Sequence, residues 1–316
     1  MIRTGKTRNT LLLGAALVLG LAGCGDAGNK ADAAPGSEKL AVVATTPQVA
    51  DFVRNIGGGD VAVTQIIEPG VDPHEYEPTP ADIQAIGQAK LVVKSGVGLE
   101  RWLDQTIQSA GFSGPVVDSS LGVPLRQGEP GDDEMKDGDP HIWHDPRNAK
   151  IMVADIEKGL AGADPAHSSA YARNLAAYES KLDQLDAGNV AAFAKLPADD
   201  RKLVTNHDAF GYYVDRYHLQ FVGSVIPSMD TSAELSAKQL DGLVAKIKAT
   251  GTKAIFTESS LPPKTADAIA RQAGVKVIGG DDALYGDSLG PAGSPGATYL
   301  GAEEHNTQVI VSALEG

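Results

Sequence analysis

The sequence predicts an α/β protein of two domains with mainly parallel sheets, joined by one long rigid helix. Its 316 residues suggest about two domains at roughly 150 residues each. Short apolar runs alternate with amphipathic stretches, which is typical of strand–helix units with parallel strands. One amphipathic stretch, longer than the others, separates two blocks of this kind.

The alternation gives the position of each expected element. Seven apolar runs predict strands at residues 40–44, 61–67, 91–94, 202–205, 219–226, 253–257 and 275–278. Five amphipathic stretches predict helices at residues 48–56, 80–88, 99–109, 233–249 and 262–273.

The long helix is predicted to begin at Asp164-Pro165, which offers an N-cap and a proline at the first helical position. It is expected to run to about Lys195, roughly 45 Å at 1.5 Å per residue. One apolar stripe follows its length, at Tyr171, Leu175, Tyr178, Leu182 and Leu185. We expect this helix to connect the two blocks. The alternative, a long helix packed wholly within one domain, is left open by the apolar stripe.

Composition and charge exclude several classes of protein. The chain is 42% hydrophobic and 22% charged, which is ordinary for a globular protein and excludes a disordered chain. Its net charge of −14 argues against nucleic-acid binding, for which a basic face is expected. The single cysteine excludes an intramolecular disulfide, a CxxC redox site and a cysteine-rich zinc site.

The N-terminus predicts export. Three basic residues precede an uncharged apolar run, 11–21, which is too short to span a bilayer comfortably, so residues 1–23 are interpreted as a signal peptide. The run ends in Leu-Ala-Gly-Cys, which resembles a bacterial lipobox with Cys24 as the lipidated residue. Residues 24–39 are expected to form a flexible tether. We therefore expect an extracytoplasmic protein with a lipid anchor; an ordinary cleaved signal is the alternative.

Three of the seven histidines lie in unusual contexts. His74 lies in GVDPHEYEPTP after one predicted strand, His141 in DPHIWHDP, and His207 in TNHDAF after another strand. Ligands of open α/β sheets bind beyond the carboxyl ends of strands, and imidazole suits zinc and its neighbours in the transition series. Because no tight metal-ligand spacing occurs, spacing alone leaves metal ligands and ordinary surface histidines both open.

The order of these motifs carries a resemblance. Along the chain come a lipobox, PGVDPHEYEPTPAD, DPHIWHDPRNA, a long helix and VTNHDAFGYY. This order resembles that of the zinc/manganese solute-binding lipoproteins of bacterial ABC importers. The resemblance covers essentially the whole chain after residue 23. It implies two α/β lobes, 40–163 and 197–316, joined by a connecting helix, 164–196, with a metal in the cleft between them.

The resemblance also implies a ligand set drawn from four separate segments: His74, His141, His207 and Asp287. The last assignment is the least specific, because Asp281 and Asp282 lie close by. Family members with histidine at the third position resemble zinc binders, and those with a carboxylate there resemble manganese or iron binders. Three imidazoles and one carboxylate suit tetrahedral Zn²⁺, whereas manganese prefers more oxygen ligands. We therefore expect Zn²⁺.

Several neighbouring residues are expected either to bind the metal as well or to contact one of its ligands: His144, Glu75, Asp145 and Asp208. His144 stands where the family usually has leucine, and a solvent-facing replacement is the favoured interpretation of it. A contact or packing role at most is expected for Glu77, Trp143, Phe210, Glu234 and Glu258. The acidic segment 127–140 replaces a His-rich loop of many zinc members. It is expected to be a mobile loop, solvated or collecting cations weakly through Asp132, Asp133, Glu134 and Asp137.

The resemblance implies a receptor that captures zinc and delivers it to the membrane permease of an ABC importer. Four protein ligands would close the coordination sphere, which favours carriage over catalysis. A zinc hydrolase, with water in place of Asp287 and Glu75 as the base, is the alternative from another class. A manganese or iron importer and an adhesin-like lipoprotein are alternatives closer to the family. We expect a monomer, and the sequence leaves open whether a metallochaperone loads it.

Overall fold

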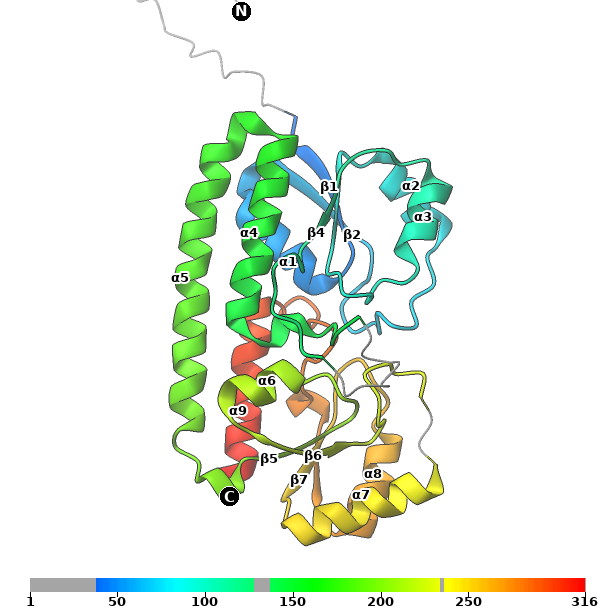
Figure 1. Ribbon diagram of the computed structural model, residues 1–316, viewed down its shortest axis with the longest axis vertical. Helices are drawn as coiled ribbons and strands as arrows, with labels where there is room; N and C mark the ends of the chain where they lie inside the picture. The colour runs from blue at the N-terminus through cyan, green and yellow to red at the C-terminus, as the bar shows by residue number, and fades with distance from the viewer. Residues whose placement is uncertain (1–37, 128–136, 234–235, 316) are drawn as a thin grey trace, which may run out of the picture. The chain divides into compact units, whose positions relative to one another are not determined.

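The fold is described from a computed structural model, in which residues 38–127, 137–233 and 236–315 are described (Figure 1). Several sequence predictions therefore lie outside the described residues. These are the signal peptide, the tether up to residue 37, Cys24, most of the acidic segment with Asp132, Asp133 and Glu134, and Glu234.

The first lobe is built around a four-stranded parallel sheet of order β2-β1-β3-β4. Its strands are β1 (Leu40–Ala44), β2 (Val61–Gln65), β3 (Leu91–Lys94) and β4 (Val116–Asp118). Its helices are α1 (Pro47–Gly57), α2 (Pro80–Gln88), α3 (Leu103–Ala110) and α4 (Pro146–Ala163). Figure 1 shows α1 and α4 on one side of the sheet and α2 and α3 on the other.

The central strands are nearly all apolar because both faces of the sheet are covered. Val42 and Val93 pack into one core with α1 and α4, whereas their neighbours Val43 and Val92 pack into a second core with Ile86 and Leu103. Side chains that follow one another on a strand point to opposite faces of the sheet. Each of these two strands therefore contributes one valine to each core.

The second lobe contains two parallel strand pairs. The strands are β5 (Lys202–Thr205) with β6 (Gln220–Ser224), and β7 (Ala254–Phe256) with β8 (Lys276–Ile278). The helices are α6 (Gly211–Tyr217), α7 (Ala237–Thr250), α8 (Lys264–Ala273) and α9 (Tyr299–Glu315). The expected α/β architecture with parallel sheets is therefore confirmed among the described residues.

The predicted elements are present, with shifts at their ends. The helix expected from residue 233 begins at Ala237, because Ser236 caps it and forms a capping box with Gln239. The sequence pattern did not predict β4, α4, α6 or α9. The pattern did not predict helix α9 because its buried positions include the polar Glu303, Asn306 and Thr307, which weaken the amphipathic pattern.

The long helix α5 (Ser168–Phe193) is present, and its predicted start at Asp164-Pro165 coincides with the 3₁₀ turn that leads into it. Residues Pro165–His167 form a separate 3₁₀ turn, and α5 begins at Ser168. Asp164 does not cap α5. Its Oδ2 instead accepts a hydrogen bond from Tyr171 Oη at 2.8 Å and lies 2.6 Å from His167 Nδ1.

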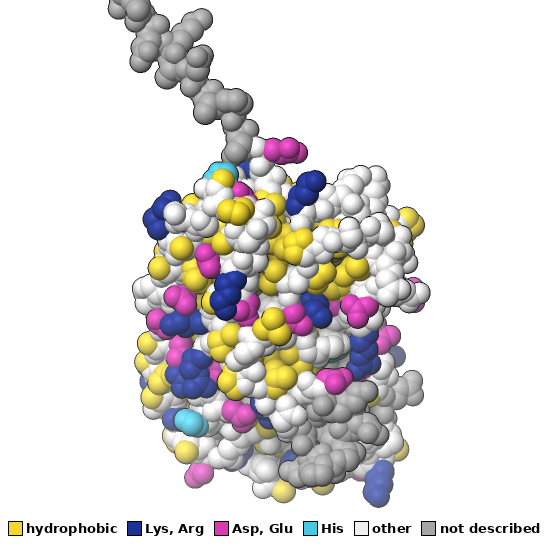
Figure 2. Space-filling model, turned by 45° about the horizontal axis from the view of Figure 1, so that its top comes forward, with side chains coloured by type: hydrophobic (Ala, Val, Ile, Leu, Met, Phe, Trp, Pro, Cys, Tyr) yellow, Lys and Arg dark blue, Asp and Glu magenta, His cyan; other side chains and the backbone are white. Residues whose placement is uncertain are grey.

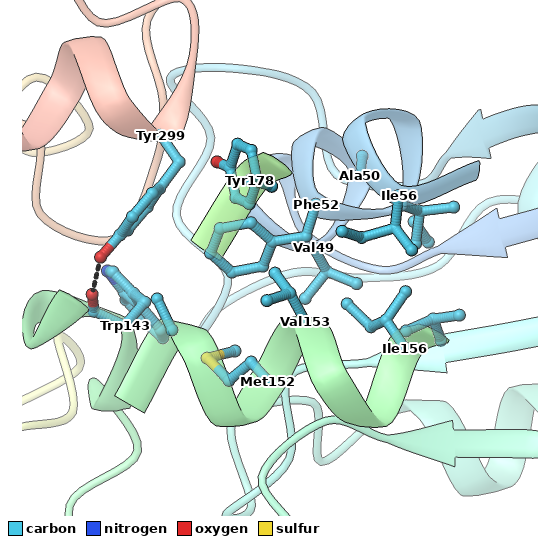
Figure 3. Packing of buried hydrophobic residues seen from close by; sticks show 14 of the residues in the cluster. Val49, Ala50, Phe52, Ile56, Trp143, Met152, Val153, Ile156, Tyr178 and Tyr299 are labelled. Carbon is cyan, nitrogen blue, oxygen red and sulfur yellow. Dashed lines mark hydrogen bonds between the residues drawn. The ribbon is translucent and has the colours of Figure 1, made fainter. Parts of the chain in front are cut away.

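Three of the described helices contribute both to the first-lobe core that contains Val42 and to a core of the second lobe: α6 does so through Tyr212 and Tyr213, and α5 and α9 do so as well. From α5, Tyr171 and Tyr178 pack into the core of the first lobe and Phe193 into that of the second. From α9, Tyr299 packs into the first core and Leu314 into the second. Figure 3 shows Tyr299 reaching toward Phe52 and Trp143, and its Oη donates to Trp143 O at 2.6 Å. The lobes are therefore joined by α9 as well as by α5.

The surface shows how the net charge is distributed. On the face seen in Figure 2, acidic and basic side chains are interspersed with apolar ones. Acidic and basic side chains are therefore not segregated on this face. Among the described residues, no helix combines the length and apolar character needed to cross a membrane.

Candidate metal centre

Four side chains from four segments converge at one point: His74, His141, His207 and Asp287. His74 lies in the loop after β2, His207 lies just beyond the end of β5, and Asp287 lies between β8 and α9. His141 directly precedes the 3₁₀ turn Ile142–His144. Each residue offers one donor atom, and these atoms all lie within 4.8 Å of one another. The strands of both lobes thus deliver ligands from their carboxyl ends, as open α/β sheets do.

The distances between the donor atoms fit a small cation. Nε2 of His74 lies 3.3 Å from Nε2 of His141 and 3.4 Å from Oδ2 of Asp287. Nε2 of His141 lies 3.2 Å from Oδ1 of Asp287, and Nε2 of His207 lies 3.1 Å from Oδ2. Tetrahedral ligands at about 2.0–2.1 Å from a zinc ion lie about 3.3 Å from one another. The four residues are therefore spaced as ligands of one ion.

Buried carboxylates set the tautomer of two imidazoles. Nδ1 of His141 lies 2.8 Å from Asp139 Oδ1, and Nδ1 of His207 lies 3.0 Å from Glu258 Oε1. Each Nδ1–H donates to its carboxylate, which leaves Nε2 facing the other residues of the converging group. The sequence named Glu258 only as a contact or packing residue and gave Asp139 no individual role.

Asp287, the fourth residue of the converging group, is buried. Asp287 is 1% exposed, and within the described part of the chain neither of its oxygens has a hydrogen-bond partner; the same holds for Nε2 of His207. Buried polar atoms are rarely left unpaired, so a cation fits this position well. Both oxygens of Asp287 face imidazole nitrogens, which allows the carboxylate to bind through one oxygen or through two.

The electrostatics favour a second proton on His141 and on His207 when no cation is bound. Burial lowers the pKa of His141, but the carboxylates of Asp287 and Asp139 outweigh burial and raise that pKa to about 9. Burial likewise opposes charge on His207, yet Asp287 and Glu258 hold its pKa well above the ordinary value. Burial would raise the pKa of Asp287, but the three imidazoles hold it well below its usual range. A metal must displace these protons in order to bind.

The favoured interpretation of His144 was wrong, because the side chain is fully buried and does not face solvent. Its Nδ1 lies 2.8 Å from Oε1 of Glu303, and its ring stacks on Phe210 with a centroid distance of 4.5 Å. Glu303 belongs to α9, a helix that the sequence pattern did not predict, so this partner was not foreseen. His144 is not a member of the converging group.

The other predicted neighbours also lie outside the converging group. Glu75 is exposed. Asp145 caps α4 by accepting from Arg147 N at 2.9 Å, and Asp208 donates its backbone N–H to Ser228 O. Trp143 holds the segment that carries Asp287, because its Nε1 donates to Gly286 O at 3.2 Å. The competing aspartates at 281 and 282 are both exposed.

Comparison with known proteins agrees with this fold. The family described as "Zinc-uptake complex component A periplasmic" (ZnuA) matches residues 42–313. The structure of the periplasmic zinc binding protein TroA from Treponema pallidum superposes with a TM-score of 0.81 at 34% identity. That superposition covers 88% of this chain and 99% of TroA.

Curated relatives cover nearly the whole chain. "Zinc-binding protein TroA" of Treponema pallidum is 36% identical over 291 residues, 91% of this chain and 92% of TroA. "Manganese-binding lipoprotein MntA" of Bacillus subtilis is 34% identical over 301 residues, 93% of this chain and 95% of MntA. "Metal ABC transporter substrate-binding lipoprotein FimA" of Streptococcus parasanguinis is 30% identical over 315 residues, 98% of this chain and 99% of FimA. The chain therefore belongs to the ZnuA family, the metal-binding receptors, not enzymes, that serve the membrane permeases of ABC importers.

Proposed function

We propose that this protein captures Zn²⁺ outside the cytoplasm and delivers it to its permease. The observation that supports the proposal is the convergence of three Nε2 atoms and one carboxylate on a single buried point. Binding by His74, His141, His207 and Asp287 closes the coordination sphere of a four-coordinate ion. A closed sphere leaves no position for an activated water, so the site carries the ion without using it in a reaction.

The choice of zinc over manganese is part of the proposal. Three imidazoles favour zinc, whereas binding through both oxygens of Asp287 would give the higher coordination number that suits manganese. The relatives are divided, since TroA is named as zinc-binding and MntA as manganese-binding. Histidine at position 207, where a carboxylate would add oxygen, is the feature that favours zinc.

Raw affinity is a poor test of the metal, because nitrogen and oxygen sites bind Zn²⁺ more tightly than Mn²⁺ in general. The sharper test deletes the gene in its host and limits zinc or manganese separately. We expect the deletion strain to grow more slowly than its parent only when zinc is limiting, and we expect reintroduction of the intact gene to restore growth. A growth defect under manganese limitation alone would contradict the zinc proposal.

The ligand set is tested by titration calorimetry of the mature protein. The parent is expected to bind one Zn²⁺ per chain, and the variant His74→Ala plus His207→Ala to lose tight binding. Retained affinity in that variant would refute the ligand assignment. Asp281→Ala serves as the control, because Asp281 is exposed and lies close to Asp287 in sequence.

We also propose that Cys24 carries a lipid and that the mature receptor is a monomer. The relatives MntA and FimA are named as lipoproteins, which supports the lipobox assignment. Labelling of growing cells with a fatty acid is expected to mark the parent and not Cys24→Ala. Light scattering of the soluble form, from which the anchor is removed, is expected to give the mass of one chain.

A further inference from the structure

A small cavity marks the approach to the metal centre. It has a volume of about 50 Å³, and its wall includes His74 with Arg101 from the first lobe and Asp230 from the second. The side chain of His74 is 7% exposed, whereas those of His141, His207 and Asp287 are 0% exposed. Among the four converging residues, solvent therefore reaches the site at His74.

Two polar contacts cross from one lobe to the other beside His74. Arg101 Nη1 lies 3.1 Å from Asp230 Oδ2, and Thr231 Oγ1 donates to Asp72 Oδ2 at 2.6 Å. The other oxygen of Asp72 accepts the backbone N–H of His74 at 2.9 Å. The adjacent residues Asp230 and Thr231 thus hold two separate loops of the first lobe, and one of these loops carries His74.

The first-lobe side of these contacts is held firmly. Glu100 is buried, and its carboxylate accepts from Ser95 N at 2.6 Å, Thr45 Oγ1 at 2.6 Å and Gly96 N at 3.1 Å. Val97 has a φ of 51°, a conformation that costs a β-branched residue energy and that persists only when its surroundings enforce it. The loop that presents Arg101 therefore has one well-determined shape.

The second-lobe side is a turn between β6 and α7. Asp230 Oδ1 accepts from Ser232 N at 3.0 Å and from Ser232 Oγ at 2.7 Å, and Asp230 N donates to Ser228 Oγ at 2.9 Å. Ser228 O in turn accepts from Asp208 N, next to His207. Since these bonds lie at or near the turn, it can separate from the first lobe without unpairing a strand.

We propose that Asp230-Thr231 is the gate of the metal centre, and that the ion enters and leaves past His74 when its contacts to Arg101 and Asp72 open. This inference rests on the proposed function, because it needs a metal at the four converging residues. None of the four residues that make these two contacts, Asp72, Arg101, Asp230 and Thr231, belongs to the converging group, so the contacts can form over the filled and the empty site alike. Such a gate slows entry and release by the same factor and leaves the equilibrium affinity unchanged.

The strength of the contacts suits a gate. The Arg101 side chain is 75% exposed, and exposed ion pairs contribute little, so this contact opens readily. The hydrogen bond from Thr231 to the Asp72 carboxylate is less exposed and charge-assisted, and contacts of that kind are stronger. Loss of the threonine hydroxyl should therefore affect the rates more than loss of the arginine charge.

The test is stopped-flow measurement of Zn²⁺ entry and of Zn²⁺ release to a chelator, with the mature protein. Arg101→Gln is expected to speed both rates about threefold. Thr231→Val is expected to speed both about tenfold. In both variants the equilibrium affinity should stay within about twofold of the parent. Thr231→Ser keeps the hydroxyl and should keep the parent rates. Lys150→Gln removes another exposed ion pair, to Asp183 on α5, and should also leave them unchanged.

Two results would overturn the gate. One is that Arg101→Gln and Thr231→Val both exchange zinc at the parent rates. The other is faster release with unchanged entry, which would mean that the contacts stabilise only the filled site. Absence of zinc binding by the parent itself would instead refute the proposed function, so the two failures are distinguishable.

Discussion

Nδ1 of His144 lies 2.8 Å from Oε1 of Glu303, and this pair joins the segment of one proposed ligand to α9. The side chains are 0% and 2% exposed. His144 follows His141 by one turn, and Asn306 on α9 bonds the backbone of Tyr285, two residues before Asp287. The pair therefore belongs to a brace that holds the His141 and Asp287 segments together.

The single variant His144→Leu is expected to destabilise the metal-free protein by about 3–5 kcal/mol, because it leaves the buried Glu303 carboxylate without its partner. The double variant His144→Leu plus Glu303→Leu should recover most of that loss. Urea unfolding measures both. A single variant as stable as the parent would show that the pair contributes nothing to folding.

Zinc binding at pH 7 is expected to release about two protons, one from His141 and one from His207. The pKa of His141 is raised to about 9, and that of His207 is raised as well, so both imidazoles are charged at pH 7 before the ion arrives. Affinity should therefore increase as the pH rises from 7 toward the pKa of His141 at about 9. Calorimetry in buffers of different ionisation enthalpy counts the protons, and a count of zero would contradict this charge state.

The stability of the metal-free protein is expected to decrease as the pH rises from about 6.5 to about 9. The pKa of His141 is higher in the folded state than in the unfolded chain. Its contribution is therefore fully present below about 6.5 and disappears as the pH rises through the folded value. Thermal unfolding with a chelator present measures this trend. The zinc-loaded protein should lose this pH dependence over most of the same range, because the ion has already displaced the protons that stabilise the metal-free form; equal slopes would refute the argument.

Asp139→Asn and Glu258→Gln are each expected to lower zinc affinity about 10- to 100-fold, because each removes the carboxylate that orients an imidazole. Competition with a chelator of known affinity measures the effect. Asp208→Asn is the matched control: Asp208 follows His207 in sequence but lies outside the converging group, so parent affinity is expected. An equal loss of zinc affinity in Asp208→Asn would show that the effect comes from removing any carboxylate near the site. It would not then come from the contacts between these carboxylates and the imidazoles.

The sequence predicted those parts of the fold in which local pattern and environment agree. The runs at β1, β3 and β5 are apolar because they are buried in parallel sheets, and the structure has strands at the predicted residues. Helix α2 matches as well, because Thr79 and Asp82 form a capping box at its start.

The sequence failed where burial depends on distant partners. Polar Glu303 and Asn306 are buried in α9 because they bond His144 and Tyr285, and no local pattern shows such pairs. The proposed ligands come from four distant segments, so spacing left the site open and only the family resemblance grouped them. The mistaken interpretation of His144 had the same origin, since its partner lies on the unpredicted helix.

The position of Tyr299 has a consequence for how the chain matures. This residue of α9 packs edge-on against Phe52 at 4.8 Å, and its backbone N–H donates to Asp51 at 3.0 Å. The interior of the first lobe is thus completed by a helix that follows every other described element in the chain. We therefore expect the first lobe to stay incompletely packed until α9 has been synthesised, so that the first lobe cannot mature independently of the second.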